Sequence, residues 1–192
     1  NNSFKITPAL FDIWMQLLHQ VAGSLLWLLD GPHADNLRRQ AQARGIDPAR
    51  LVFAPKVAPD AHLARHQLAD LFLDSLPYNA HTTGSDALWA GLPVLTRIGR
   101  SYAARVAASL LHAVGLPQLC ADSLPGYQAQ VLALAGDAQA RQRIRTQLEA
   151  SRDVAPLFDS EAYARDFSAL IWRMAERHAQ GLPADHLLAQ QE

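Results

Sequence analysis

The sequence has few of the features that mark secreted, membrane or nucleic-acid-binding proteins. Its single cysteine, Cys120, excludes an internal disulfide and a multi-cysteine metal site, which fits a reducing compartment. No apolar run approaches the roughly 18 residues of a membrane-spanning helix, and no signal-peptide pattern occurs. The formal net charge is −1, so the chain lacks the excess of basic residues that is typical of proteins that bind nucleic acid or anionic membranes. We therefore expect a cytoplasmic protein without nucleic-acid or membrane partners.

Metal-binding patterns are also absent from the sequence. No Asp-x-Asp pair occurs, and no pair among the eight histidines has the spacing and neighbours of a metal-binding helix. His81 is the one histidine near the motif described below, and a lone histidine without carboxylate partners binds Mg²⁺ or Mn²⁺ poorly. We expect no metal and no other cofactor.

The remaining composition is typical of a globular α/β protein. With 192 residues the chain can bury roughly 70% of the surface that it exposes when unfolded, so one sizeable domain is expected. Short apolar runs alternate with amphipathic stretches, which predicts a Rossmann-like, doubly wound parallel sheet. The strands are expected near 24–30, 50–54, 70–74, 93–96 and 118–120, and the helices near 8–22, 35–44, 60–67, 82–90, 103–114, 124–135, 137–151 and 160–180.

The order of these elements indicates a fragment of a longer protein. The sequence starts at Asn1-Asn2-Ser3 without methionine, and its first expected element is a helix rather than the strand that should occupy the sheet centre. We therefore expect that residues 1–192 form the second Rossmann-like half of a two-domain protein, with a helical part over about 124–182. Its ligand would face a cleft shared with the other half.

A polar loop and the start of a helix follow the strand expected at 70–74. His81, Thr82, Thr83 and Gly84 lie at the carboxyl end of that strand, where open α/β sheets bind their ligands. The hydroxyls of Thr82 and Thr83 and the N–H groups of a helix amino terminus are suited to bind a phosphate, and Gly84 has no side chain to keep the phosphate away. Asp86 is placed to accept a hydrogen bond from a sugar hydroxyl. Alternatively, Thr83 is an N-cap and Asp86 completes a capping box.

Three other basic or aromatic side chains are expected at the same edge. If a strand ends just before Asn1, then Lys5 lies in its βα loop and points at the same phosphates; otherwise it is a solvated charge. His62 and Arg65 are three residues apart and share a helical face. They are suited to stacking on a nucleobase, with the loop backbone around Val57 reading its edge, or they belong to an ordinary exposed helix.

Several blocks together resemble the protein O-linked N-acetylglucosamine transferases of glycosyltransferase family 41, in their bacterial form. The resemblance runs almost from end to end of the chain, and its blocks are Phe4-Lys5-Ile6-Thr7-Pro8, Leu25-Leu26-Trp27-Leu28-Leu29, Gln67-Leu68-Ala69-Asp70, His81-Thr82-Thr83-Gly84, Asp86-Ala87-Leu88-Trp89-Ala90-Gly91-Leu92-Pro93-Val94, Arg105-Val106-Ala107-Ala108-Ser109 and Pro156-Leu157-Phe158-Asp159. The resemblance implies the C-terminal half of a GT-B glycosyltransferase, preceded in the whole protein by an N-terminal catalytic half and helical TPR repeats.

The resemblance also implies a role for each matching residue. Lys5 resembles the family's essential lysine on the donor diphosphate. His81, Thr82 and Thr83 resemble its phosphate-binding triplet, Asp86 its ribose-binding carboxylate, and His62 with Arg65 its uracil-contacting pair. Two positions differ from the animal enzymes, because Asn2 replaces a glutamine and Pro59 a ribose-contacting lysine, with Lys56 three residues away.

The function implied is inverting transfer of N-acetylglucosamine from a UDP donor to Ser or Thr hydroxyls of a protein acceptor, without a metal. Two alternatives remain open at this stage. One is a GDP-fucose-dependent protein O-fucosyltransferase, as in the related SPINDLY-type proteins. The other is a nucleotide-sugar-binding module that has lost transfer, against which the retention of Lys5 argues.

Overall fold

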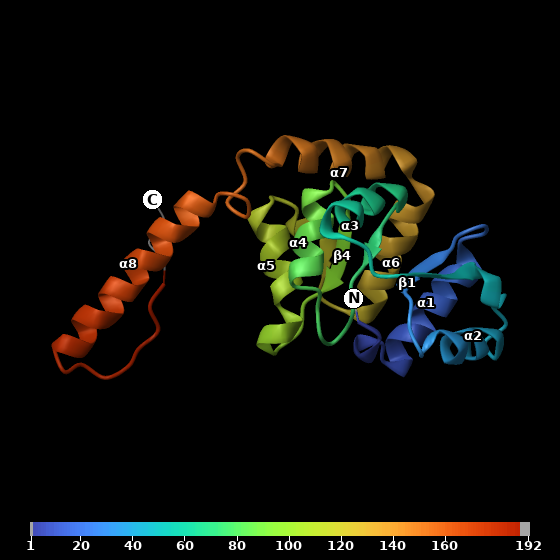
Figure 1. The fold of residues 1–192 in the computed structure, drawn as a ribbon, viewed down its shortest axis with the longest axis horizontal. Helices are drawn as coiled ribbons and strands as arrows, with labels where there is room; N and C mark the ends of the chain where they lie inside the picture. Colours follow the sequence, from blue (N-terminus) through green and yellow to red (C-terminus); the bar gives the residue numbers. More distant parts are fainter. Residues whose placement is uncertain (1, 189–192) are drawn as a thin grey trace.

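A computed structural model describes residues 2–188 and contains alternating strands and helices (Figure 1). The strands are short, and the order of elements follows the sequence-based expectation. In chain order they are α1 (Pro8–Gln20), β1 (Leu26–Leu29), α2 (Ala34–Gln42), β2 (Leu51–Ala54), α3 (Pro59–Arg65), β3 (Phe72–Leu73), α4 (Thr82–Trp89), β4 (Val94–Arg97), α5 (Val106–Ala113), β5 (Cys120–Ala121), α6 (Leu124–Gly136), α7 (Ala138–Ser151) and α8 (Ser160–Ala179).

Helix α1 shows how local sequence sets an element and its buried face. The hydroxyl of Thr7 accepts from the backbone N–H of Leu10 at 3.3 Å, and Pro8 occupies the first turn, where its missing N–H costs nothing. The apolar residues then recur at helical spacing, and all of them are buried: Leu10, Phe11, Ile13, Trp14, Met15, Leu17 and Leu18. The helix expected over residues 8–22 is confirmed and ends at Gln20.

All strand pairs of the described residues are parallel, as predicted, but they form two separate sheets. Strand β1 pairs with β2, and β4 pairs with β3 on one side and β5 on the other. Strands β1 and β3 do not pair, and the sequence-based expectation places the absent central strand of the parallel sheet outside these residues. The additional central strand expected from the sequence stays a prediction. The edge strand expected at 118–120 begins later, at Cys120.

Strand β4 separates two groups of buried side chains, because successive residues of a strand face opposite sides. Leu95 belongs to a cluster formed with α1, α6 and the first sheet, which includes Leu10, Trp14 and Tyr127. Val94 belongs to the cluster on the other side, formed with α4, α5 and α7, which includes Leu88. Helices thus cover both faces of the second sheet, so the doubly wound α/β class is confirmed.

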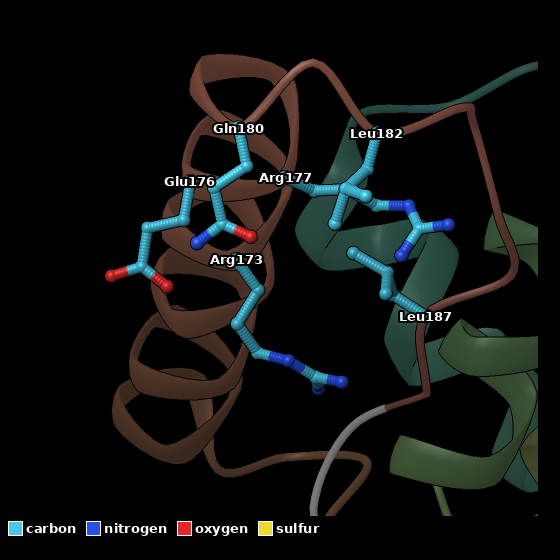
Figure 2. Close-up of a pocket in the computed structure, with 6 residues that line it drawn as sticks. All are labelled: Arg173, Glu176, Arg177, Gln180, Leu182 and Leu187. Atoms are coloured by element: carbon cyan, nitrogen blue, oxygen red, sulfur yellow. The ribbon is translucent and has the colours of Figure 1, made fainter.

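The C-terminal part is helical, as expected, but its last helix has no buried residue. Helix α7 crosses over the second sheet's helices, whereas α8 projects away from the rest of the molecule (Figure 1). The chain after α8 turns back along it, and Arg177 holds this segment through the Pro183 carbonyl at 2.6 Å and Asp185 at 3.4 Å. Figure 2 shows the shallow hollow of about 180 Å³ between the two, lined by Arg173, Glu176, Arg177, Gln180, Leu182 and Leu187.

Candidate functional site

Lys5 lies against the loop that connects β3 to α4. It ends a short 3-10 turn, Ser3–Lys5, and its ammonium donates to the carbonyl of Asn79 at 2.8 Å. The same ammonium lies 4.1 Å from the centre of the Tyr78 ring, a cation–π geometry. Burial lowers the pKa of Lys5, and the charge of Asp74 acts in the opposite direction. The structure therefore brings Lys5 to the edge at which the sequence predicted it.

The loop of residues 75–80, which receives Lys5, is fixed from within. The Ser75 hydroxyl donates to the carbonyl of Tyr78 at 2.7 Å, and the Asn79 amide side chain donates to the carbonyl of Ser75 at 3.2 Å. The backbone N–H of Asn79 donates to the Ala103 carbonyl at 2.8 Å. These bonds hold the Asn79 carbonyl in place for the ammonium of Lys5.

Asp74 directly precedes this loop and binds backbone groups at both of its ends. Its side chain is fully buried, one oxygen accepts from the backbone N–H groups of Ser75 at 2.7 Å and Ala80 at 2.6 Å, and the other accepts from the Thr96 hydroxyl of β4 at 2.6 Å. Burial raises the pKa of Asp74 to about 6, although these donors and the charge of Lys5 act against the shift. At neutral pH the carboxylate is therefore ionised.

The amino terminus of α4 follows directly, and its cap differs from the capping-box interpretation. The helix begins at Thr82 with His81 as its N-cap residue, and the His81 side chain makes no cap hydrogen bond. Thr83 is thus not the N-cap, and Asp86 does not close a capping box with it. The hydroxyls of Thr82 and Thr83 lie in the first turn, at the positive end of the helix dipole.

Gly84 differs from its expected role. A Cβ added to it would lie 3.3 Å from the Ala80 Cβ and 3.3 Å from the Leu110 Cδ1, so its open side faces protein rather than a ligand. Its N–H donates to the His81 carbonyl at 2.9 Å. The glycine lets the first turn of α4 pack closely on the loop and on α5, and the idea that it leaves space for a ligand is wrong.

His81 lies between two aromatic rings. It stacks on Tyr78, with ring centres 5.2 Å apart and planes 20° apart, and meets the edge of Tyr102 at 6.0 Å. Its Nε2 atom is buried and has no hydrogen-bond partner among the described residues. Through Tyr78, the imidazole of His81 belongs to the same group of side chains as Lys5.

His62, Arg65 and Asp86 meet at the other end of the same edge. The Arg65 guanidinium donates to His62 Nδ1 at 2.7 Å and to the Pro55 carbonyl at 2.8 Å. Because a guanidinium can only donate, His62 Nδ1 accepts and its Nε2 carries the proton. That Nε2 is 3.9 Å from Asp86 Oδ2. Burial, followed by the charges of His66 and Arg65, lowers the pKa of His62, which favours this neutral form.

Two predicted residues have weaker links to this arrangement. Asn2 is exposed, and its backbone carbonyl accepts from the N–H of Lys5 at 3.1 Å. Val57 is 44% exposed in the loop before α3. A broad hollow of about 440 Å³ on α7 and the hollow beside α8 both lie away from all predicted residues. The geometry of the site comes from side-chain contacts rather than from a deep pocket.

The sequence-based prediction missed the residues that support the site from behind. Tyr78 and Asn79, which contact Lys5, and Asp74 are not among the predicted site residues. The carboxylate of Asp74 nevertheless accepts from the N–H groups of Ser75 and Ala80 and from the Thr96 hydroxyl. The available signal was a charged residue that directly follows a short apolar run and precedes a polar loop.

Neither a metal centre nor a membrane span is found in the part of the chain that the structure describes. Over residues 2–188, no group of three His, Cys, Asp or Glu side chains is placed to hold a metal ion. Over the same residues, every helix is too short or too polar to cross a bilayer.

The parallel strands, the helices on both faces and the polar edge at the strands' carboxyl ends define a Rossmann-like α/β domain of the kind that binds nucleotides. A family model described as Glycosyl transferase family 41 matches residues 1–167. The chain therefore belongs to glycosyltransferase family 41.

Known proteins similar to the chain agree with this family. It is 38% identical to a UDP-N-acetylglucosamine–peptide N-acetylglucosaminyltransferase of Caenorhabditis elegans, over 97% of the chain and 16% of that protein. It is 34% identical to the probable transferase SEC of Arabidopsis thaliana, over 97% of the chain and 19% of that protein. The solved structure of a mutant Thermobaculum terrenum O-GlcNAc transferase superimposes with a TM-score of 0.84 at 29% identity, over 93% of the chain and 36% of that structure. The chain thus spans about a fifth or less of the length of the two transferases from Caenorhabditis elegans and Arabidopsis thaliana.

Proposed function

We propose that this chain binds UDP-N-acetylglucosamine and stabilises the UDP leaving group while N-acetylglucosamine is transferred, with inversion, to Ser or Thr hydroxyls of a protein. The observation that carries the proposal is the position of Lys5, whose ammonium is held at the Asn79 carbonyl just before the amino terminus of α4. The names of the relatives support the donor and the acceptor class.

In the proposed reaction, the acceptor oxygen attacks the anomeric carbon as the bond to the β-phosphate oxygen breaks. The electron pair of that bond leaves with UDP, so negative charge grows on the diphosphate. Lys5, the hydroxyls of Thr82 and Thr83 and the dipole of α4 are directed at that charge. Such preorganised donors are worth about 3–4 kcal/mol each when well placed. A side-chain base for the acceptor, if one is used, belongs to the N-terminal catalytic half.

The nucleoside would bind along the rest of the edge. Asp86 accepts from the ribose, and His62 and Arg65 stack on or contact the uracil, with Asn2 and the backbone of Val57 completing the donor contacts. The side-chain contacts support this assignment for three of these residues, because Arg65 orients His62 and His62 faces Asp86. A rigid, already paired group loses little conformational freedom when the base binds.

Replacement of Lys5 with alanine in the full-length enzyme tests the proposal. The rate constant of transfer should fall by a factor of about 100 or more, whereas the affinity for UDP should fall much less, because the interaction strengthens as charge develops. Single-turnover kinetics and calorimetric titration with UDP measure the two quantities. Arg39→Ala removes an exposed charge on α2 and serves as the control. Equal losses of rate and affinity would contradict a role at the leaving group.

The same titration separates the donor nucleotides. UDP should compete with the donor far better than GDP does. Tight competition by GDP would favour the fucosyltransferase alternative, and UDP binding without any transfer would favour the module that has lost activity.

A further inference from the structure

Asp74 is a buried charged residue, and its hydrogen bonds alone do not explain why this position carries a charge. An asparagine in the same place would accept from the N–H groups of Ser75 and Ala80 through its oxygen and donate to the Thr96 hydroxyl through its nitrogen. The same three contacts would then form without the free-energy cost of burying a carboxylate. The chain instead places a fully buried aspartate at this position.

The charge of Asp74 is coupled to Lys5. Each of the two groups shifts the pKa of the other toward its charged form, and Asp74 is fully buried whereas Lys5 is partly buried. No direct ion pair forms between them in the described residues, so the ammonium is directed to the Asn79 carbonyl and the Tyr78 ring. One donated hydrogen bond leaves two N–H groups of the ammonium for an anionic ligand.

We infer that Asp74 is a positioning residue of the donor site. Its carboxylate fixes the loop of residues 75–80 at both ends, so that the Asn79 carbonyl holds the ammonium of Lys5 beside the amino terminus of α4. This inference rests on the proposed function of Lys5. Asp74 itself is buried beneath the loop and acts through Lys5 rather than on the substrate.

The test is a double-mutant cycle in the full-length enzyme, with Asp74→Asn, Lys5→Ala and the combination of both. Asp74→Asn keeps the size and the three contacts and removes the charge. It should slow transfer about tenfold when Lys5 is present and change the rate less than about twofold when Lys5 is alanine, because coupled residues are not additive. UDP affinity, measured by calorimetry, should fall less than the rate.

Two further variants separate an effect on Lys5 from a general loss of packing. Ser151→Ala removes a buried hydroxyl on α7 that donates to the Leu148 carbonyl at 2.8 Å, so it tests the effect of a buried polar deletion away from the site. It should leave transfer unchanged. If the circular dichroism spectrum of Asp74→Asn differs from that of the parent enzyme, Thr96→Val replaces it in the double-mutant cycle. Thr96→Val removes one hydrogen-bond donor to the carboxylate at nearly constant volume.

Each outcome decides between the two proposals. A loss confined to proteins that contain Lys5 supports the inference. An equal loss with and without Lys5 overturns it and leaves Asp74 a structural residue, while the proposed function stands. If the parent enzyme fails to bind UDP or to transfer sugar, the proposed function itself is wrong.

Discussion

At the scale of single residues, the proposed donor site consists of half-buried polar groups held by neighbouring side chains and backbone. Lys5 is held by Asn79 and Tyr78, and the loop that contains them is held by Asp74. His62 is oriented in the same way by Arg65. Groups fixed before a ligand arrives do not have to reorganise as charge develops, which is what makes electrostatic stabilisation effective.

Asp86 provides a test of nucleoside binding. Asp86→Asn keeps the size of the side chain but removes a charged acceptor, so UDP affinity should fall by about 1–3 kcal/mol while the melting temperature stays the same. The melting temperature should not change because Asp86 lies one turn inside α4, whose N-cap residue is His81. Calorimetry with UDP and thermal denaturation measure both quantities, and Asp60→Asn on α3 is the matched control. A lower melting temperature with unchanged affinity would show a structural role instead.

The raised pKa of Asp74 predicts how stability depends on pH. The folded protein binds its proton more tightly than the unfolded chain does, with a pKa of about 6 against 3.8. The resulting stabilisation is fully present below pH 4 and is lost as pH rises through about 6, and its size is about 3 kcal/mol. Asp74→Asn cannot titrate. The free energy of unfolding of the parent relative to this variant, from urea titrations at pH 4 and pH 7.5, should therefore decrease with pH, and a constant difference would contradict the shift.

At the scale of elements, the position of α4 depends on close packing at its first turn. The buried Gly84 allows the helix to approach Ala80 and Leu110 more closely than a side chain would permit. The loop that holds Lys5 and the helix terminus that faces the predicted phosphates are thereby fixed to each other. Helix α8 is the opposite case, because it has no buried residue and presents Phe167 and Trp172 to solvent.

Gly84→Ala should destabilise the protein, and it should also weaken UDP binding. The added Cβ would be 3.3 Å from two neighbouring carbons, and overpacking of this kind costs about 1–3 kcal/mol. Gly136→Ala in α6 is the control, because a Cβ there meets nothing within 4 Å. It should be neutral or slightly stabilising. Urea denaturation compares the two variants, and an equal effect of both would show that helix propensity, rather than packing, decides the result.

At the scale of the whole molecule, charge on the diphosphate has to be neutralised by groups of the protein. The sequence contains no Asp-x-Asp pair, and it offers Lys5 and a helix amino terminus equivalent to about half a positive charge. We therefore expect the full-length enzyme to keep its transfer activity in excess EDTA. Radiolabelled sugar transfer with and without EDTA measures this. Loss of activity that Mn²⁺ restores would show that the assignment to Lys5 and the loop is incomplete.

The sequence by itself determined the class of the fold and the order of its elements, because these depend on local patterns. Thr7-Pro8 starts α1, and apolar periodicity places the strands and helices within a few residues. A polar loop after a buried strand indicated the binding edge. These signals need no knowledge of distant contacts.

Only the tertiary structure decided which groups support the site, because these contacts join residues far apart in the chain. The bond from Lys5 to Asn79 spans 74 positions, and the bond from Thr96 to Asp74 spans 22. The direction in which Gly84 faces and the choice of His81 as N-cap also depend on how α4 packs. Local propensity cannot fix such contacts, since their geometry is set by the sheet and by the helices that cover it.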